Sequence, residues 1–275
     1  MLPVDAPDRP EPSNDYLLDN RAPEAEQRFD SLSALFNPGT FRHMERLGVT
    51  GGWHCWEVGV GGPSIPMWLA DRVGPTGRVL ATDIDLRWAE QAAASGVELL
   101  EHDVAHDEPP TGGFDLVHER LVLIHLPDRE EALDRMVDAL RPGGWVLIED
   151  FDSEMQPRAC PDELGPEQRR ANEMRGGLRE LLAGRGADMR LGRRLPRMLR
   201  DAGLEEVGAD AYLALSLPAA VAMEQANVRQ VRDDYVRHGL TSDDEIDRHL
   251  DALAAGRLDV ASPVLVSAWG RKPLR

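Results

Sequence analysis

Three acidic residues and two glycines form the pattern with the clearest chemical meaning in this sequence. Glu57 ends an apolar run and is followed by Gly59 and Gly61, and Asp83 and Asp103 end the next two apolar runs. Glycines let a ligand approach the backbone where side chains would collide. Asp83 has the spacing of an acid that accepts hydrogen bonds from both ribose hydroxyls of a nucleoside, and Asp103 can accept from an adenine amino group. Three carboxylates on one rim would repel pyrophosphate, so the pattern favours a nucleoside that carries positive charge.

The glycine-rich stretch "EVGVGG" also has an alternative interpretation, a tight strand-to-helix turn that binds no ligand. Pro63 suits the first position of the following helix, because its missing N–H leaves no donor unpaired there. A dinucleotide fingerprint would require glycine at Ser64. A Walker-type phosphate loop would require lysine after its glycines, and the only lysine of the chain is Lys272.

Alternating strands and helices must position these residues. Strands are expected over the apolar runs 53–58, 77–83, 97–103, 114–120 and 145–150. Helices are expected between them over 64–74, 86–96 and 128–140. Strands separated by helices imply a parallel sheet with helices on both faces, and ligands bind beyond the carboxyl ends of such strands. The acids and glycines above all follow strands, so they are expected to meet at one edge of the sheet.

The chain resembles the class I S-adenosylmethionine-dependent methyltransferases, particularly the branch similar to the ubiquinone/menaquinone methyltransferases and bacterial natural-product methyltransferases. "EVGVGG" is similar to the family's acid-x-Gly-x-Gly motif, "VLATDID" to its second-strand acid motif and "EHDV" to its adenine-contacting turn. "FDLVHERLVLIHLPD" and "LRPGGWVLIED" resemble the fourth strand and the approach to the fifth, and they are the most specific matches. The resemblance covers residues 50–150 well and the flanking segments only in layout. Pro63 departs from the pattern, since the family commonly has a third glycine there.

The resemblance implies S-adenosylmethionine as the cofactor, held by a defined set of contacts. Gly59 and Gly61 would line its methionine portion, and Glu57 would meet its ammonium group. Asp83 would take the ribose hydroxyls and Asp103 the adenine amino group. The remaining implied contacts are Ile84 beside the adenine, Trp88 against its face, the Val104 backbone at an adenine nitrogen and Glu119 near the methionine moiety.

The resemblance implies a single α/β domain with a Rossmann-like, mostly parallel seven-stranded sheet, an antiparallel last strand, helices on both faces and a helical cap. Residues 1–14, rich in proline and acid, are expected to form a disordered leader. The expected parts of the domain 15–275 are an N-terminal helical cap over 15–50, a cofactor-binding core over 51–150, substrate-side helical insertions over 151–203 and 218–258, and final strands over 204–217 and 263–271. Each insertion is expected to hold two helices.

No catalytic residue can be assigned from the sequence. Methyl transfer from a sulfonium depends mainly on positioning the acceptor, and a base is needed only if the acceptor must lose a proton. His118 and His125 are candidate bases, although His125 lies in an apolar run and is expected to pack between strand and helix. Asp150 and Asp152 could orient an acceptor hydroxyl, but exposed loop acids without a role are favoured.

The site must also close over its acceptor, because water would waste the methyl donor. The candidate lids are the segment "NDYLLDN" and the insertion after the fifth strand. Tyr16 is expected to cover the methionine end and to reach the cofactor's carboxylate with its hydroxyl. The alternative is a frayed terminus in which this tyrosine only packs on the first helix.

Composition limits the partners. The net charge of −18 argues against binding a nucleic-acid backbone. No apolar stretch reaches membrane-spanning length, and the N-terminus lacks the apolar core of a signal peptide, so a cytoplasmic protein is expected. His102 and His106 could hold a metal on a helix, but the prolines that follow favour a loop, and no metal is expected. A monomer and a homodimer both remain open.

Methyl transfer to a small-molecule acceptor, in specialised or quinone-like metabolism, is the leading interpretation. O-, N- and C-methylation are left open. The alternatives are a protein of the same fold that binds S-adenosylmethionine for a structural or repurposed activity and, behind it, an NAD(P)-dependent oxidoreductase. The acidic rim and the missing third glycine argue against the oxidoreductase.

Overall fold

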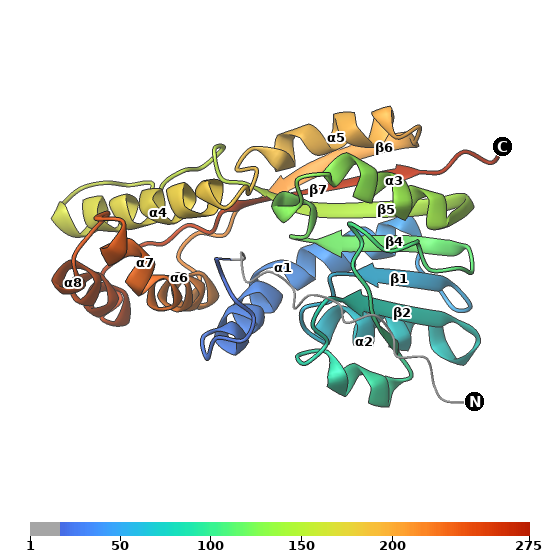
Figure 1. The fold of residues 1–275 in the computed structure, drawn as a ribbon, viewed down its shortest axis with the longest axis horizontal. Coiled ribbons are helices and arrows are strands. Elements are labelled where there is room, and N and C mark those ends of the chain that lie inside the picture. The colour runs from blue at the N-terminus through green and yellow to red at the C-terminus, as the bar shows by residue number, and fades with distance from the viewer. Residues whose placement is uncertain (1–16) are drawn as a thin grey trace, which may run out of the picture.

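The computed structural model describes residues 17–275, so Tyr16 and the leader 1–14 lie outside the described residues. Within this range one sheet of seven strands has the order β3-β2-β1-β4-β5-β7-β6 (Figure 1). The strands are β1 (His54–Val58), β2 (Arg78–Asp83), β3 (Glu98–Glu101), β4 (Phe114–Arg120), β5 (Leu140–Asp152), β6 (Glu205–Tyr212) and β7 (Val264–Arg271). The first five pair in parallel, and β7 runs antiparallel to β5 and β6. The expected sheet and its antiparallel last strand are confirmed.

Eight α-helices occur within residues 17–275. They are α1 (Ala25–Leu47), α2 (Ser64–Val73), α3 (Arg129–Ala139), α4 (Pro166–Gly184), α5 (Leu191–Asp201), α6 (Pro218–Gln230), α7 (Arg232–Arg237) and α8 (Asp243–Ala254). The helix expected over 86–96 is only the short 3-10 element η2 (Glu90–Ser95). Asp85 Oδ1 accepts the Arg87 amide at 3.2 Å, and such a local side-chain bond competes with helix formation.

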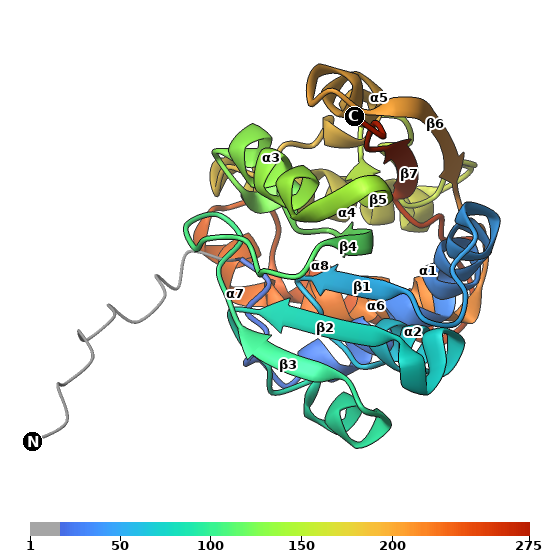
Figure 2. The same cartoon turned by 90° about the vertical axis from the view of Figure 1, so that its right-hand side faces the viewer.

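Side chains that point alternately to the two faces of the sheet form two hydrophobic cores, one on each face. Trp56 and Val117 face one side of the sheet with α3 and α5, whereas Cys55 and Leu116 face the other side with α1 and α2. Figure 2 shows α1 and α3 on opposite sides of the sheet. Successive strand residues point to opposite faces, so both faces of the central strands are apolar and both need a helical cover.

The cap lies beyond one end of the sheet and consists of α4, α6, α7 and α8 (Figure 1). Its second part, residues 218–258, contains three helices rather than the expected two. From the insertion 151–203 only α4 belongs to the cap, because α5 packs against β5 and β7. The long helix α1 contacts both α6 and α2, so it connects the cap to the sheet.

A buried ion pair joins two of the cap helices. Arg175 Nη2 on α4 donates to Glu224 Oε2 on α6 at 2.6 Å and to the Ala261 carbonyl at 3.2 Å. Burial opposes ionisation of Glu224, but Arg175 together with His249 outweighs it and lowers the pKa of this carboxyl to about 2. The pair therefore remains charged and fixes α4 against α6.

Candidate cofactor site

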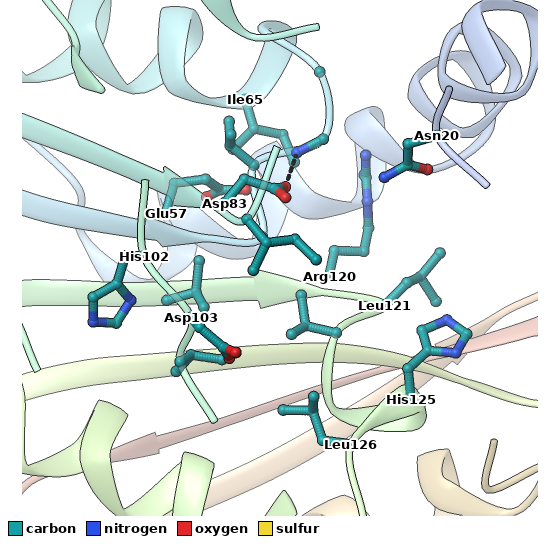
Figure 3. Close-up of a pocket in the computed structure, with 18 of the residues that line it drawn as sticks. Asn20, Glu57, Ile65, Asp83, His102, Asp103, Arg120, Leu121, His125 and Leu126 are labelled. Atoms are coloured by element: carbon teal, nitrogen blue, oxygen red, sulfur yellow. Dashed lines mark hydrogen bonds between the residues drawn. The ribbon is translucent and has the colours of Figure 1, made fainter. Parts of the chain in front are cut away.

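A cavity of about 360 Å³ lies at the carboxyl ends of β1, β2 and β4 and beside the loop after β3 (Figure 3). Seven of the ten expected cofactor contacts line it, namely Glu57, Gly59, Gly61, Asp83, Ile84, Asp103 and Val104. They come together because parallel strands end at the same edge of the sheet. The N-terminal segment and α1 form the opposite wall.

The loop after β1 has a backbone conformation at two positions that glycine adopts without strain and other residues do not. Gly59 and Gly61 have φ values of 65° and 51°, in the left-handed region. A Cβ on Gly59 would lie 2.1 Å from Val122 Cγ2, and one on Gly61 would lie 2.9 Å from Phe29 Cε1. The Gly61 amide donates to Asp83 Oδ2 at 3.0 Å (Figure 3). The loop thus presents bare backbone to the cavity, in a shape that Asp83 holds.

The Asp83 carboxylate can accept further hydrogen bonds besides the one from the Gly61 amide of the loop. Its Oδ1 accepts the Asp85 amide at 3.0 Å, and each carboxylate oxygen has a second lone pair. Burial raises the pKa of Asp83, and the amides of Gly61, Asp85 and Ile84 oppose that rise. The side chain is 9% exposed, so it lies at the cavity wall rather than in bulk water.

The adenine end of the expected site is a compact turn after β3. Asp103 Oδ1 accepts the Ala105 amide at 2.9 Å, and Asp103 Oδ2 lies 2.8 Å from His106 Nδ1. Ile84 is 55% exposed beside this turn and offers an apolar surface to a flat ring. Among residues 17–275 no group of three or more His, Cys, Asp or Glu side chains is arranged to hold a metal ion.

Trp88 and Glu119 lie behind the cavity wall rather than on it. Trp88 Nε1 donates to the Asn20 carbonyl at 2.8 Å and so holds the N-terminal segment against the site. Glu119 is fully buried, and its Oε2 accepts the Val122 amide at 2.9 Å. These two side chains support lining residues, and Tyr16 is outside the described part of the chain.

A buried chain of acids and a histidine runs from the cavity into the sheet. His118 Nδ1 lies 2.6 Å from Glu57 Oε2, and His118 Nε2 lies 3.3 Å from Glu149 Oε2. Ser267 Oγ donates to the other oxygen of Glu149 at 2.6 Å. Burial alone lowers the pKa of His118, but Glu57 and Glu149 outweigh it and raise this pKa to about 9. His118 is therefore a cation at neutral pH, which argues against its candidate role as a general base.

The acids expected to be exposed lie elsewhere than predicted, whereas the expectation for His125 is not tested. His125 lies on the cavity wall, and its packing between strand and helix stays a prediction. Asp150 and Asp152 are fully buried within β5 rather than exposed in a loop. Asp152 Oδ1 accepts from Arg193 Nη2 at 2.6 Å. Burial and the neighbouring Glu119 raise the pKa of Asp150 well above its ordinary value.

Two arginines of the cavity wall were not found from the sequence. Arg28 Nη2 donates to the Leu18 carbonyl at 2.9 Å and to Asn20 Oδ1 at 2.6 Å. Arg120 Nη1 donates to Asn37 Oδ1 at 2.9 Å. Arg120 is the last residue of the strand "FDLVHER", so its position at a strand end was an available signal. Arg28 lies in an amphipathic helix and carries no such signal.

A second cavity of about 90 Å³ adjoins the first on the side of the cap. Arg28, Leu32, Leu121 and His125 line both cavities. Leu121 has a φ of 63°, which is uncommon for a residue with a side chain. This backbone turns the chain after β4 and places Leu121 on the boundary between the two spaces.

Proteins of known structure share the fold of this chain. A phosphoethanolamine N-methyltransferase of Haemonchus contortus, solved with phosphomonomethylethanolamine and S-adenosylhomocysteine, has a TM-score of 0.57 and 15% identity over 94% of this chain and 59% of that chain. The likeness shows the fold. A methyltransferase of Strobilurus tenacellus is 35% identical over 97 residues, 35% of this chain and 34% of its own length. The ubiquinone/menaquinone biosynthesis C-methyltransferase of Ectopseudomonas mendocina is 26% identical over 143 residues, 47% of this chain and 56% of its own.

The chain thus spans about half or less of the length of these curated relatives. Within residues 17–275 no helix is long and apolar enough to cross a membrane. A family model described as a methyltransferase domain matches residues 64–208, which is more than half of the chain. Together with the seven-stranded sheet, this match shows that the chain belongs to the class I S-adenosylmethionine-dependent methyltransferases.

Proposed function

We propose that the protein transfers a methyl group from S-adenosylmethionine to a small-molecule acceptor. The observation that carries this proposal is the pairing of a bare glycine loop with an acid at the end of each of the first two strands, around one cavity. A nucleoside with a positively charged amino-acid portion matches that combination of backbone and charge. When bound, S-adenosylmethionine supplies a methyl group that is already activated by its sulfonium.

The ribose and the adenine would lie between β2 and the turn after β3. The free lone pairs of Asp83 can accept from the two ribose hydroxyls while the same side chain holds the Gly61 amide. Ile84 would pack against one face of the adenine ring. The Asp103 side chain and the Val104 backbone would form hydrogen bonds with the edge of the ring. Trp88 and Glu119 act indirectly, through Asn20 and Val122.

The amino-acid portion would lie over the glycine loop. Glu57 lines the cavity and suits the ammonium group, and the carboxylate group then requires a cation nearby. Arg120 lines the same cavity and is partly buried at the end of β4, where a guanidinium can bind a carboxylate through two parallel hydrogen bonds. The opposite charges of Glu57 and Arg120 therefore define which way the amino acid lies.

The acceptor is proposed to be a small molecule of specialised or quinone-like metabolism. The similarity to the ubiquinone/menaquinone biosynthesis C-methyltransferase of Ectopseudomonas mendocina supports a quinone-like acceptor. The second cavity also supports it, because its volume of about 90 Å³ admits a small ring or chain and no polymer. Its walls come from the cap helices α4 and α6, from α1 and from the chain after β4, and they would exclude water around the reacting atoms.

An isotope experiment tests the proposal. The protein is incubated with methyl-labelled S-adenosylmethionine and a metabolite extract, and labelled products are sought by mass spectrometry. Labelled small-molecule product together with S-adenosylhomocysteine is the expected result. Cofactor binding without any transfer would favour the alternative of a repurposed activity on the same fold. Binding of a nicotinamide dinucleotide in preference to S-adenosylmethionine would reject the proposal.

A further inference from the structure

His118 is a fully buried histidine that lies behind the first cavity without lining it. It stands on β4, between Glu57 on β1 and Glu149 on β5, and both glutamates are buried as well. His118 Nδ1 lies 2.6 Å from Glu57 Oε2, and His118 Nε2 lies 3.3 Å from Glu149 Oε2. An ionised carboxylate only accepts hydrogen bonds, so only the doubly protonated ring can donate to both acids at once.

The far end of this arrangement is anchored in the core. Ser267 Oγ donates to Glu149 Oε1 at 2.6 Å, and Thr40 Oγ1 donates to the same Glu149 oxygen that His118 faces. The donors to Glu149 therefore come from three different elements, β4, β7 and α1. Because a buried carboxylate is costly unless it is hydrogen-bonded, these contacts fix Glu149 and so set the plane of the His118 ring.

The charges of this group support one another. Burial alone would lower the pKa of His118, but Glu57 and Glu149 raise it to about 9. Burial likewise opposes ionisation of Glu149, but His118, His43 and Arg120 outweigh it and hold the pKa of this carboxyl below its ordinary value. A cation between the two acids offsets the repulsion that would otherwise move their carboxylates apart.

Glu57 is the residue through which this group reaches the first cavity (Figure 3). Its side chain is 2% exposed and lies in the cavity wall. Because Glu57 Oε2 faces His118, Glu57 Oε1 is left to accept from a ligand. A carboxylate that is already oriented binds an ammonium group more tightly, since no side-chain entropy is then lost on binding.

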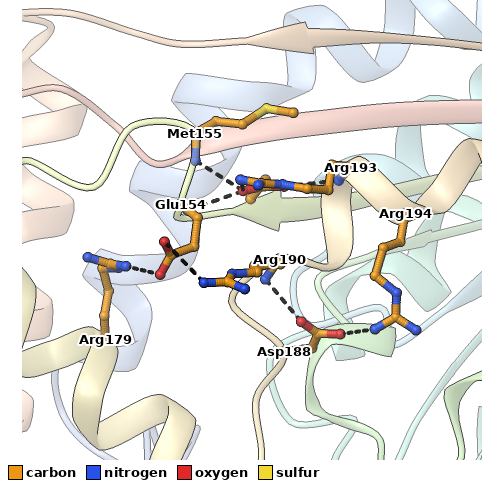
Figure 4. Close-up of polar contacts among 8 residues, drawn as sticks. Glu154, Met155, Arg179, Asp188, Arg190, Arg193 and Arg194 are labelled. Atoms are coloured by element: carbon orange, nitrogen blue, oxygen red, sulfur yellow. Dashed lines mark hydrogen bonds and ion pairs between the residues drawn. The ribbon is translucent and has the colours of Figure 1, made fainter.

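A second group of charged residues follows β5, and it does not reach the first cavity. Glu154 lies there beside Arg179 and Arg190 (Figure 4). The Glu154 side chain is 32% exposed, and none of these three residues lines the first cavity. Water screens such a pair, so it has little influence on the acid in the cavity wall. Glu154 therefore offers a control for substitutions of the buried glutamates.

We propose that His118 is a positioning residue for the methyl donor: set in place by Glu149, it fixes the Glu57 carboxylate that binds the ammonium group of S-adenosylmethionine. This inference rests on the proposed function, and on the contact between Glu57 and the ammonium group in particular. His118 touches no ligand and transfers no proton. Its effect on binding is therefore confined to ligands that carry the ammonium group, and it disappears when Glu57 is replaced.

The test compares two ligands that differ only in the ammonium group. One is S-adenosylhomocysteine, and the other is its deaminated analogue, in which hydrogen replaces that group. Calorimetry at pH 7, where the ammonium group and His118 are both charged, measures the two affinities. The wild type should bind S-adenosylhomocysteine about 10-fold or more tighter than the analogue. His118→Gln should weaken S-adenosylhomocysteine about 5-fold or more and should change the affinity for the analogue less than about twofold.

A double variant shows whether His118 acts through Glu57. In a Glu57→Gln background, His118→Gln should cause no further loss of the preference for S-adenosylhomocysteine, because the carboxylate that it orients is gone. Glu149→Gln should reduce the preference less than His118→Gln does, since the new amide oxygen can still accept from the ring. Losses that add fully in the double variant would overturn the inference.

Two variants control for the general effect of disturbing a buried or charged side chain. His249 is another buried histidine, whose Nε2 lies 3.8 Å from Glu224 Oε1 in the cap, and it lines neither cavity. His249→Gln should lower stability and keep the wild-type ratio of the two affinities. Glu154→Gln, outside the first cavity, should keep that ratio as well.

The inference is overturned by an unchanged ratio in a folded His118→Gln variant, or by equal losses for the two ligands. If that variant does not fold, NMR of wild-type protein with ¹⁵N-labelled histidine rings decides. The ring signal that moves in Glu57→Gln should then shift with S-adenosylhomocysteine and not with the analogue, and an equal response to both overturns the inference. Failure of the wild type to bind S-adenosylhomocysteine, which is measured first, would reject the proposed function itself.

Discussion

Glu57 Oε2 lies 2.6 Å from His118 Nδ1, so the acid expected to meet the cofactor's ammonium is also one half of a buried ion pair. Replacing Glu57 by Gln removes one of the two charges that hold His118 as a cation. The variant should lose about 1–3 kcal/mol of unfolding free energy as well as cofactor affinity. Urea denaturation and calorimetry measure the two quantities. Unchanged affinity in a folded, less stable variant would make Glu57 a purely structural residue.

Asp83 should likewise affect both binding and loop geometry. Asp83→Ala removes the acceptor of the Gly61 amide and leaves two ribose hydroxyls without partners. The expected loss of affinity for S-adenosylhomocysteine is about 1–3 kcal/mol, or roughly 5- to 150-fold. Asp85→Ala, which leaves the Asp83 carboxylate in place, is the matched control and should have a much smaller effect. Equal losses in the two variants would contradict the ribose assignment.

Stability should fall between about pH 6.5 and pH 9 because of His118. Its pKa is raised from the model-peptide value of 6.5 to about 9, so the folded state binds the proton more tightly than the unfolded state. That contribution is complete below pH 6.5 and is lost as pH rises through about 9. Urea unfolding at both pH values measures it, and His118→Gln should show a smaller difference between them. An equally large difference in the variant would place the titration on a group other than His118.

Trp88 should control the order of the N-terminal segment. Trp88→Phe keeps the ring but removes the hydrogen bond to the Asn20 carbonyl, and Asn20 lines the cavity. Hydrogen exchange over residues 17–22 should become faster, and cofactor affinity should fall several-fold. Trp68→Phe is the control, because Trp68 stacks on Phe41 at 4.6 Å and does not line the cavity. Identical exchange in wild type and Trp88→Phe would show that this bond does not hold the segment.

The strand ends were predictable from the sequence because their signal is local. An apolar run followed by Glu57 or Asp83 defines a strand and its end within a few residues, and parallel pairing brings these ends together. Asp150 and Asp152 were misplaced because β5 extends through them to pair with β7, more than a hundred residues later. Their burial depends on that distant strand, and no local pattern contains it.

The cap side of the site could not be predicted for the same physical reason. Arg28 becomes a lining residue only when α1 packs against α6, where Gln230 accepts one of its hydrogen bonds. From the sequence alone, Arg28 is one charged residue on an amphipathic helix. His125 likewise faces the cavities only because the chain turns at Leu121, and nothing in "VLIHLP" indicates that turn.

The contribution of cap helices to the wall of the second cavity alone has an evolutionary consequence. Leu178, Met223 and Asn227, which line the second cavity, stand on α4 and α6, and none of them lines the first. Under the proposed function, mutations at these positions would change the accepted molecule without disturbing the strand ends proposed to bind the methyl donor. After gene duplication, descendants of this chain can therefore diverge in substrate through few substitutions. A library of variants randomised at these three positions only would test whether such substitutions change the substrate.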